Sequence, residues 1–151
     1  MRGGTENVYG IAGLAKALEM AYEHMDGYRQ HIEEVRSYFM EKLLDNFEDI
    51  QFNGDYDGDY LYTILSVSFP ESAKSELLLL LLDIAGVSAS GGSACSSGAE
   101  AGSHVLAAIG ADPSRKTIRF SFSHYNTKSE IDAVIEKLKT MVEVRKMEAV
   151  A

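Results

Sequence analysis

The only cysteine of this chain, Cys95, is its clearest candidate nucleophile. Free cysteines are most often small buried hydrophobes that lie among aliphatic residues. Cys95 instead lies in residues 88–98, a stretch of serine, glycine and alanine without a large apolar anchor. Such a loop can expose a thiol and direct backbone N–H groups at the thiolate, which is the reactive form. The residue pattern leaves both interpretations open and favours the reactive one.

Arg119 is the second candidate. It alternates with Ile118 and Phe120 in a strand-like segment, so its side chain should point away from the core that they face. It is either a solvated strand arginine or a bidentate clamp for a carboxylate. His104 follows the cysteine stretch and could act as a base for Cys95 or be structural. One cysteine and four histidines without metal-ligand spacing predict no metal site.

Bulk properties limit the partners and the location. The 151 residues suit one compact domain. A net charge of -9 without a cluster of Lys and Arg predicts no nucleic-acid partner. The longest apolar run, residues 77–82, is far shorter than a membrane-spanning helix of about 20 residues. No signal peptide is visible. We therefore expect no membrane association and a cytoplasmic location, which a lone cysteine fits.

The first half of the chain predicts helices and then a sheet. Apolar residues recur at helical spacing over residues 11–43, with an interruption at Gly27, and predict one long or two abutting helices whose apolar stripe faces a core. Arg36 is expected in solvent. Residues 50–52 and 61–69 read as strands. Ser72 or Ser75 should cap a buried helix over residues 77–82, which Gly86 ends.

The second half predicts the same mixture. A short helix should begin near Ser103 and end before Gly110, followed by a half-buried strand over residues 117–122. Thr127 and Glu130 have the spacing of a capping box at the start of a final helix. No repeat or internal domain boundary is visible. The predicted fold class is α+β, a small and mainly antiparallel sheet covered by helices.

Five stretches in order resemble the cysteine desulfurases, which are pyridoxal-phosphate enzymes of the aspartate aminotransferase fold. Residues 2–8 (RGGTENV) resemble the segment that opens the small C-terminal domain of that family. Residues 90–97 (SGGSACSS) are similar to its cysteine loop, and this motif is highly specific. The other three stretches are residues 103–106 (SHVL), 118–121 (IRFS) and 126–132 (NTKSEID).

The resemblance implies a reaction and residue roles. Pyridoxal phosphate would act as an electron sink while Cys95, as a thiolate, takes the sulfur of L-cysteine, leaving L-alanine and a persulfide. Arg119 would grip the substrate carboxylate. Thr5 would reach the cofactor phosphate of the neighbouring subunit in a homodimer. The sulfur would then pass to an iron–sulfur scaffold or another acceptor protein, for iron–sulfur cluster assembly or tRNA thiolation. His104 departs from the aromatic residue expected there.

The resemblance also implies that much of the enzyme lies outside this sequence. No His-Lys pair is present, whereas the cofactor-binding lysine of the family follows a histidine. We therefore expect residues 1–151 to be the small domain alone, without the large cofactor-binding domain and inactive by itself. The alternatives are a selenocysteine lyase, a non-catalytic module that binds a scaffold protein or carries persulfide, and a thiol redox sensor, although no resolving cysteine is present.

Overall fold

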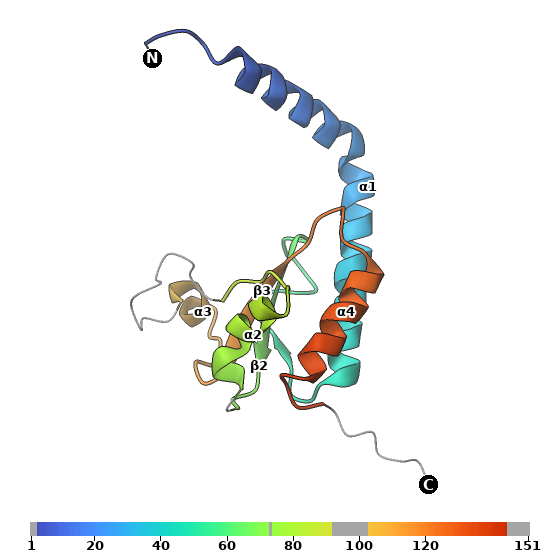
Figure 1. Cartoon of the computed structure of the whole chain (residues 1–151), viewed down its shortest axis with the longest axis vertical. Helices are drawn as coiled ribbons and strands as arrows, with labels where there is room; N and C mark the ends of the chain where they lie inside the picture. Colours follow the sequence, from blue (N-terminus) through green and yellow to red (C-terminus); the bar gives the residue numbers. More distant parts are fainter. Residues whose placement is uncertain (1–2, 73, 92–102, 145–151) are drawn as a thin grey trace.

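The computed structural model describes residues 3–72, 74–91 and 103–144. Figure 1 shows the arrangement of its helices and its small sheet. In chain order the elements are α1 (Val8–Asn46), β1 (Gln51–Phe52), β2 (Ile64–Phe69), a 3₁₀ turn η1 (Ser75–Leu77), α2 (Leu78–Ile84), α3 (His104–Ala108), β3 (Lys116–Ser121) and α4 (Lys128–Lys139). This mixture confirms the predicted α+β class.

The three strands form one antiparallel sheet in the order β1-β2-β3. Alternation along the strands gives the sheet one apolar and one polar face. The apolar face packs on α1, α2 and α4, and Phe39 of α1 meets Phe120 edge to face at a centroid distance of 4.9 Å. The buried strand residues of this core are Leu65, Val67, Phe69, Ile118 and Phe120. The helices therefore lie against the sheet as the alternating pattern predicted.

The first half of α1 departs from the expectation of a core-facing stripe. The helix runs without interruption through Gly27, but its apolar residues before that point are exposed. Their positions lie on the same stripe that is buried further along at Ile32, Phe39 and Leu43. Figure 1 shows this first half leaving the body of the molecule. The exposed residues, here called the α1 stripe, are Val8, Ile11, Leu14, Leu18, Tyr22 and Met25.

Arg36 was expected in solvent, and this expectation was wrong. Its side chain is 3% exposed, and its Nη2 donates to the Tyr56 carbonyl at 2.8 Å. The guanidinium carbon also lies 4.1 Å from the centre of the Tyr60 ring. Burial lowers the pKa of Arg36 below its usual value, while the coulombic effects of Tyr60 and then Glu33 oppose this shift. The arginine thus fastens the loop before β2 to α1, which helical periodicity alone could not reveal.

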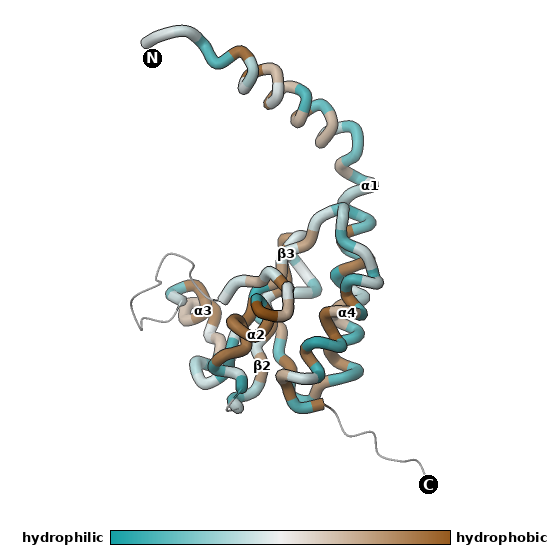
Figure 2. The backbone as a smooth tube through the Cα atoms, in the orientation of Figure 1, coloured by the Kyte–Doolittle hydropathy of each residue, from teal (hydrophilic) through white to brown (hydrophobic). Residues whose placement is uncertain are grey.

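The leucine-rich segment is only partly buried. Leu78 and Leu82 of α2 are fully buried, whereas Leu80 is 53% exposed, so the expectation of burial on all sides was wrong. The helix also starts differently, because Ser72 and Ser75 bond to each other around η1 and no side chain caps α2 itself. Figure 2 shows the hydrophobic colouring of α2. Its end was predicted correctly, since the residue at Gly86 has a φ of 76°, in the left-handed region.

The starts of the last two helices follow the prediction closely. The Thr127 side chain accepts from the Glu130 N–H, and the Glu130 carboxylate accepts from the Thr127 N–H, so the capping box is formed. Ser103 caps α3 in a similar way by accepting from the Leu106 N–H. The Tyr38 hydroxyl donates to Asp132 at 2.7 Å and links α1 to α4. These local bonds explain why both helix starts could be read from sequence.

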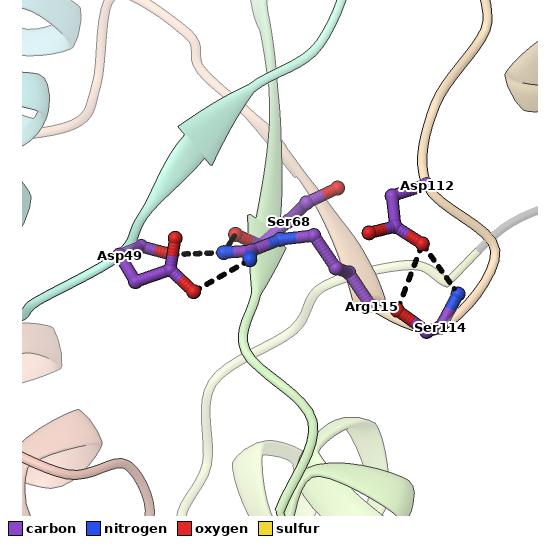
Figure 3. Close-up of polar contacts among 5 residues, drawn as sticks. All are labelled: Asp49, Ser68, Asp112, Ser114 and Arg115. Atoms are coloured by element: carbon purple, nitrogen blue, oxygen red, sulfur yellow. Dashed lines mark hydrogen bonds and ion pairs between the residues drawn. The ribbon is translucent and has the colours of Figure 1, made fainter.

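A buried arginine joins the turn before β1 to the start of β3. Figure 3 shows Arg115 reaching across to Asp49. Its Nη1 pairs with the Asp49 carboxylate at 2.7 Å, and its Nη2 donates to the carbonyls of Asp49 and Ser68. Nearby, the Asp112 carboxylate accepts from the backbone and the hydroxyl of Ser114. This cluster fixes where β3 begins relative to β2.

Candidate functional site

Arg119 lies in the middle of β3, and its side chain is exposed on the polar face of the sheet. Its cross-strand partner on β2 is Ser66. Within the described residues, the Arg119 guanidinium enters none of the ion pairs. Its neighbours Ile118 and Phe120 are buried on the other face, so the outward direction predicted from the strand pattern is confirmed. A fixed strand therefore presents the guanidinium away from the core.

The backbone of Arg119 is held on both sides. On the edge away from β2, its N–H donates to the Ser90 carbonyl at 2.6 Å and its carbonyl accepts from the Ser90 N–H at 3.1 Å. The next residue, Gly91, lies close to α2, because a Cβ there would be 3.2 Å from Leu79 Cδ2. Ser90 and Gly91 are the first two residues of the 90–97 motif. The structure thus joins the start of that motif to the arginine, a link that sequence analysis did not predict.

Cys95 itself lies outside the described residues, and so do residues 92–102 as a whole. The described chain resumes at Ser103, the cap of α3. His104 is the first residue of α3 and is exposed. The roles that the motif implies for Cys95, and the open question of His104 as a base, stay predictions.

Thr5 and Arg119 are not brought together. Thr5 is exposed in the segment before α1, where Asn7 caps the helix by accepting from the Gly10 N–H at 3.1 Å. Figure 1 shows this end of α1 far from β3. If Thr5 and Arg119 both contribute to the same kind of site, they must contribute to two separate copies of it. This is the arrangement implied by a threonine that reaches a neighbouring subunit, and the role of Thr5 stays a prediction.

The polar face also carries a network of neutral side chains that sequence analysis missed. Ser68 bonds to Thr117 at 2.8 Å across the two central strands. The Asn53 amide nitrogen donates to Ser68 at 2.8 Å and to Ser66 at 3.2 Å. Ser68 and Thr117 are buried, whereas Ser66 is half-buried and Arg119 is exposed. The alternation of serines with apolar residues in β2 could have indicated this face.

Neither a membrane segment nor a metal centre is seen in the described parts of the chain. No helix there is both long enough and apolar enough to cross a bilayer. No group of three or more acidic, histidine or cysteine residues within these ranges is arranged to hold a metal ion. The exposed Arg119 guanidinium can bind an anion.

The fold agrees with what the comparisons with known proteins show. Residues 1–134 match the family described as Aminotransferase class-V. The chain belongs to this family.

The more specific similarity is to proteins named as cysteine desulfurases. The chain is 37% identical over 144 residues to cysteine desulfurase IscS of Dictyoglomus turgidum, covering 94% of this chain and 36% of that protein. It is 38% identical to a cysteine desulfurase of Nostoc sp., with the same coverage. A NifS-like protein from Rickettsia africae has a similar structure, with a TM-score of 0.76 and 25% identity over 93% of this chain and 36% of that chain. The predicted resemblance is confirmed.

The chain spans about a third of the length of these relatives. Pyridoxal phosphate, on which the family generally depends, requires a lysine for covalent attachment and a cradle for its phosphate. The described residues do not form such a site. The N-terminal end of α1 lies far from β3, the strand that carries Arg119 (Figure 1). A hollow of about 480 Å³ beside α1 is lined by Glu33, Glu34 and Glu41 against one lysine, Lys128, so its net charge opposes a phosphate.

Proposed function

We propose that this chain is the small domain of a cysteine desulfurase that converts L-cysteine to L-alanine. Cys95, as a thiolate, attacks the substrate sulfur: an S–S bond forms as the C–S bond breaks, the electron pair of the broken bond stays on carbon, and a proton equivalent to the one lost by the thiol is taken up there to give L-alanine. Pyridoxal phosphate, if held by the complete protein, would supply the electron sink for this chemistry. The similarity to cysteine desulfurases over 94% of the chain supports the proposal.

The observation that carries the proposal from family to residues is the pairing of Ser90 with Arg119. Cys95 follows Ser90 by five residues, so covalent geometry alone keeps their Cα atoms within about 18 Å. Cys95 is thus connected through Ser90 to the strand that carries Arg119, so the thiol and the guanidinium can act on the same small substrate. Arg119 binds the carboxylate as a fixed cation, and Cys95 attacks the sulfur at the other end of the molecule.

The exposed α1 stripe supports the proposal that this domain works with a larger one. Soluble domains rarely leave a row of six apolar residues uncovered, and such patches mark interaction sites. The relatives are almost three times as long as this chain, so they contain enough additional structure to cover the stripe. We infer that the isolated chain binds pyridoxal phosphate poorly and does not turn over cysteine.

The complete protein would act as a homodimer, in which Thr5 contacts the cofactor phosphate of the neighbouring subunit. The persulfide sulfur would pass to an iron–sulfur scaffold or to another acceptor such as a tRNA-thiolation protein. The acidic surface, with a net charge of -9, favours an acceptor with a basic docking patch.

The experiment compares the complete gene product, its Cys95→Ala and Arg119→Met variants, and this chain alone. Each is incubated with L-cysteine and pyridoxal phosphate, and L-alanine and intact mass are measured. We expect alanine and one added sulfur only from the complete protein, loss of both in Cys95→Ala, and a raised KM in Arg119→Met. Lys128→Met, which removes an exposed cation at the start of α4, is the matched control. Full alanine release by Cys95→Ala would reject Cys95 as nucleophile and favour a selenocysteine lyase.

A further inference from the structure

We propose that Ser66 is a second ligand for the carboxylate that Arg119 binds, and that Asn53 orients its hydroxyl for this purpose. The inference rests on the carboxylate-binding role proposed above for Arg119. Nothing in the 90–97 motif or in the other matched stretches points to Ser66, because it lies in β2.

The register places Ser66 directly beside Arg119. The Phe122 N–H donates to the Thr63 carbonyl at 2.8 Å, so residues 63 and 122 form a hydrogen-bonded pair between β2 and β3. Pairs alternate along an antiparallel ladder, which makes Ser66 and Arg119 a non-hydrogen-bonded pair. Such pairs have the closer Cα atoms, about 4.5 Å apart, and their side chains rise from the same face.

The neighbouring pair on the same face shows that the side chains of a non-hydrogen-bonded pair can touch here. Ser68 and Thr117 form the next non-hydrogen-bonded pair along the ladder, and their hydroxyl oxygens are 2.8 Å apart. Ser66 and Arg119 have the same relation, two residues further on. The Ser66 and Arg119 side chains therefore rise as cross-strand neighbours from the same face, where one small anion can reach both groups.

The network leaves the Ser66 proton available. The two hydrogens of the Asn53 amide go to Ser66 and Ser68, so the Ser66 oxygen is an acceptor within this network. A hydroxyl that accepts from one side still has one hydrogen to donate. Among the bonds of the described residues the Ser66 hydroxyl donates to none. Asn53 is itself held by its backbone N–H, which donates to the Ser66 carbonyl at 3.0 Å.

Along the polar face, exposure increases from the Ser68–Thr117 pair to the Ser66–Arg119 pair, as a ligand site requires. Ser68 is 1% and Thr117 is 9% exposed, and they form a rigid base. Ser66 is half-buried and Arg119 is exposed, so the donors at this end are open to a ligand. A guanidinium and one adjacent hydroxyl offer charge and a separate O–H donor to a planar monoanion. The chemical class that fits is the carboxylate of an amino acid.

The test uses this chain labelled with ¹⁵N and titrated with propionate, with propanamide as the neutral molecule of similar shape. The Arg119 Nε–H signal and the Ser66 amide signal are followed in the unmodified chain and in Ser66→Ala and Ser66→Thr. Ser121→Ala is the matched control, because Ser121 is exposed on the same strand face and lies outside the Asn53 network. Thermal midpoints check that all variants remain folded.

We expect saturable shifts with propionate and none with propanamide. Ser66→Ala should weaken propionate binding about tenfold, since it removes one hydrogen bond to a charged group. Ser66→Thr and Ser121→Ala should bind as the unmodified chain does. Unchanged affinity in Ser66→Ala would overturn the inference, and so would an equal loss in Ser66→Thr, which keeps the hydroxyl.

A second measurement separates this inference from the proposed reaction. In the complete gene product, Ser66→Ala should raise the KM for L-cysteine about tenfold and leave kcat nearly unchanged, because the contact is made equally before and during the reaction. Propionate binding that depends on Ser66 stands even if the complete protein proves not to be a desulfurase. If the Arg119 signal ignores propionate in every variant, the carboxylate role of both residues is wrong, while Cys95 as nucleophile is unaffected.

Discussion

Replacing Arg115 by methionine tests how much the joint between the turn before β1 and the start of β3 stabilises the fold. The side chain of Arg115 is 7% exposed, whereas that of its partner Asp49 is 61% exposed. An ion pair with one exposed member contributes at most about 1 kcal/mol. The larger effect comes from the carbonyls of Asp49 and Ser68, which both accept from Arg115. Each loses a charged donor in the variant.

The magnitude follows from these contacts. Losing a hydrogen bond to a charged donor costs about 1.5 kcal/mol or more for a buried acceptor and less for one that water can reach. Part of the loss is offset, because the buried Arg115 Nε has no partner among the described residues and methionine removes its desolvation cost. We expect Arg115→Met to lower the free energy of unfolding by about 2–3 kcal/mol. Asp49→Asn should cost only about 0.5–1 kcal/mol, because it keeps the backbone acceptor.

The assay is urea denaturation monitored by far-UV circular dichroism, because the chain has no tryptophan whose fluorescence could be followed. Lys139→Met, which breaks the ion pair between Lys139 and Glu136 on α4, is the matched control and should change stability by less than about 0.5 kcal/mol. If Arg115→Met and Asp49→Asn cost the same, the ion pair and not the two carbonyls would dominate. The reasoning from burial would then be refuted.

Three further outcomes follow from local contacts. Thr127→Ala should cost about 1 kcal/mol of stability by opening the capping box of α4, and an unchanged thermal midpoint would contradict this. Hydrogen bonds from Ser114 hold the pKa of Asp112 below its usual value. They therefore stabilise the fold above the ordinary carboxyl pKa, and this is lost as pH falls through the lowered pKa. Ser114→Ala should raise the pKa of Asp112 in an NMR titration, and no change would refute the assignment. The uncovered α1 stripe should make the isolated chain self-associate in sedimentation velocity, and Leu18→Lys should reduce this, because Leu18 is 62% exposed on the stripe. Association that is equal in both proteins would rule the stripe out as its cause.

The local features of this fold could be predicted from sequence because neighbours along the chain produce them. The capping box at Thr127 and the left-handed residue at Gly86 depend on a few adjacent residues. The outward direction of Arg119 follows from the two-residue period of a strand. In each case the physical cause lies within the segment that carries the pattern.

Features that depend on distant contacts could not be predicted in this way. Helical periodicity gave the α1 stripe and the buried stripe around Phe39 the same appearance, although only the second has a partner in the described chain. The burial of Arg36 depends on a loop twenty or more residues away. The joining of Ser90 to Arg119 spans 29 positions. Periodicity shows that a face is apolar, but it cannot show what covers that face.

The polar face connects the stability of this domain to its proposed chemistry through strand register. A slip of one residue between β2 and β3 would move Arg119 to the core side. The apolar alternation opposes such a slip, and Arg115 adds a second restraint by binding the Ser68 carbonyl just before β3 begins. Ser68 in turn bonds to Thr117 and Asn53, and Asn53 bonds to Ser66. The joint at Arg115 therefore holds the same pairing that sets Ser66 beside Arg119, so weakening it should disturb carboxylate binding as well as folding.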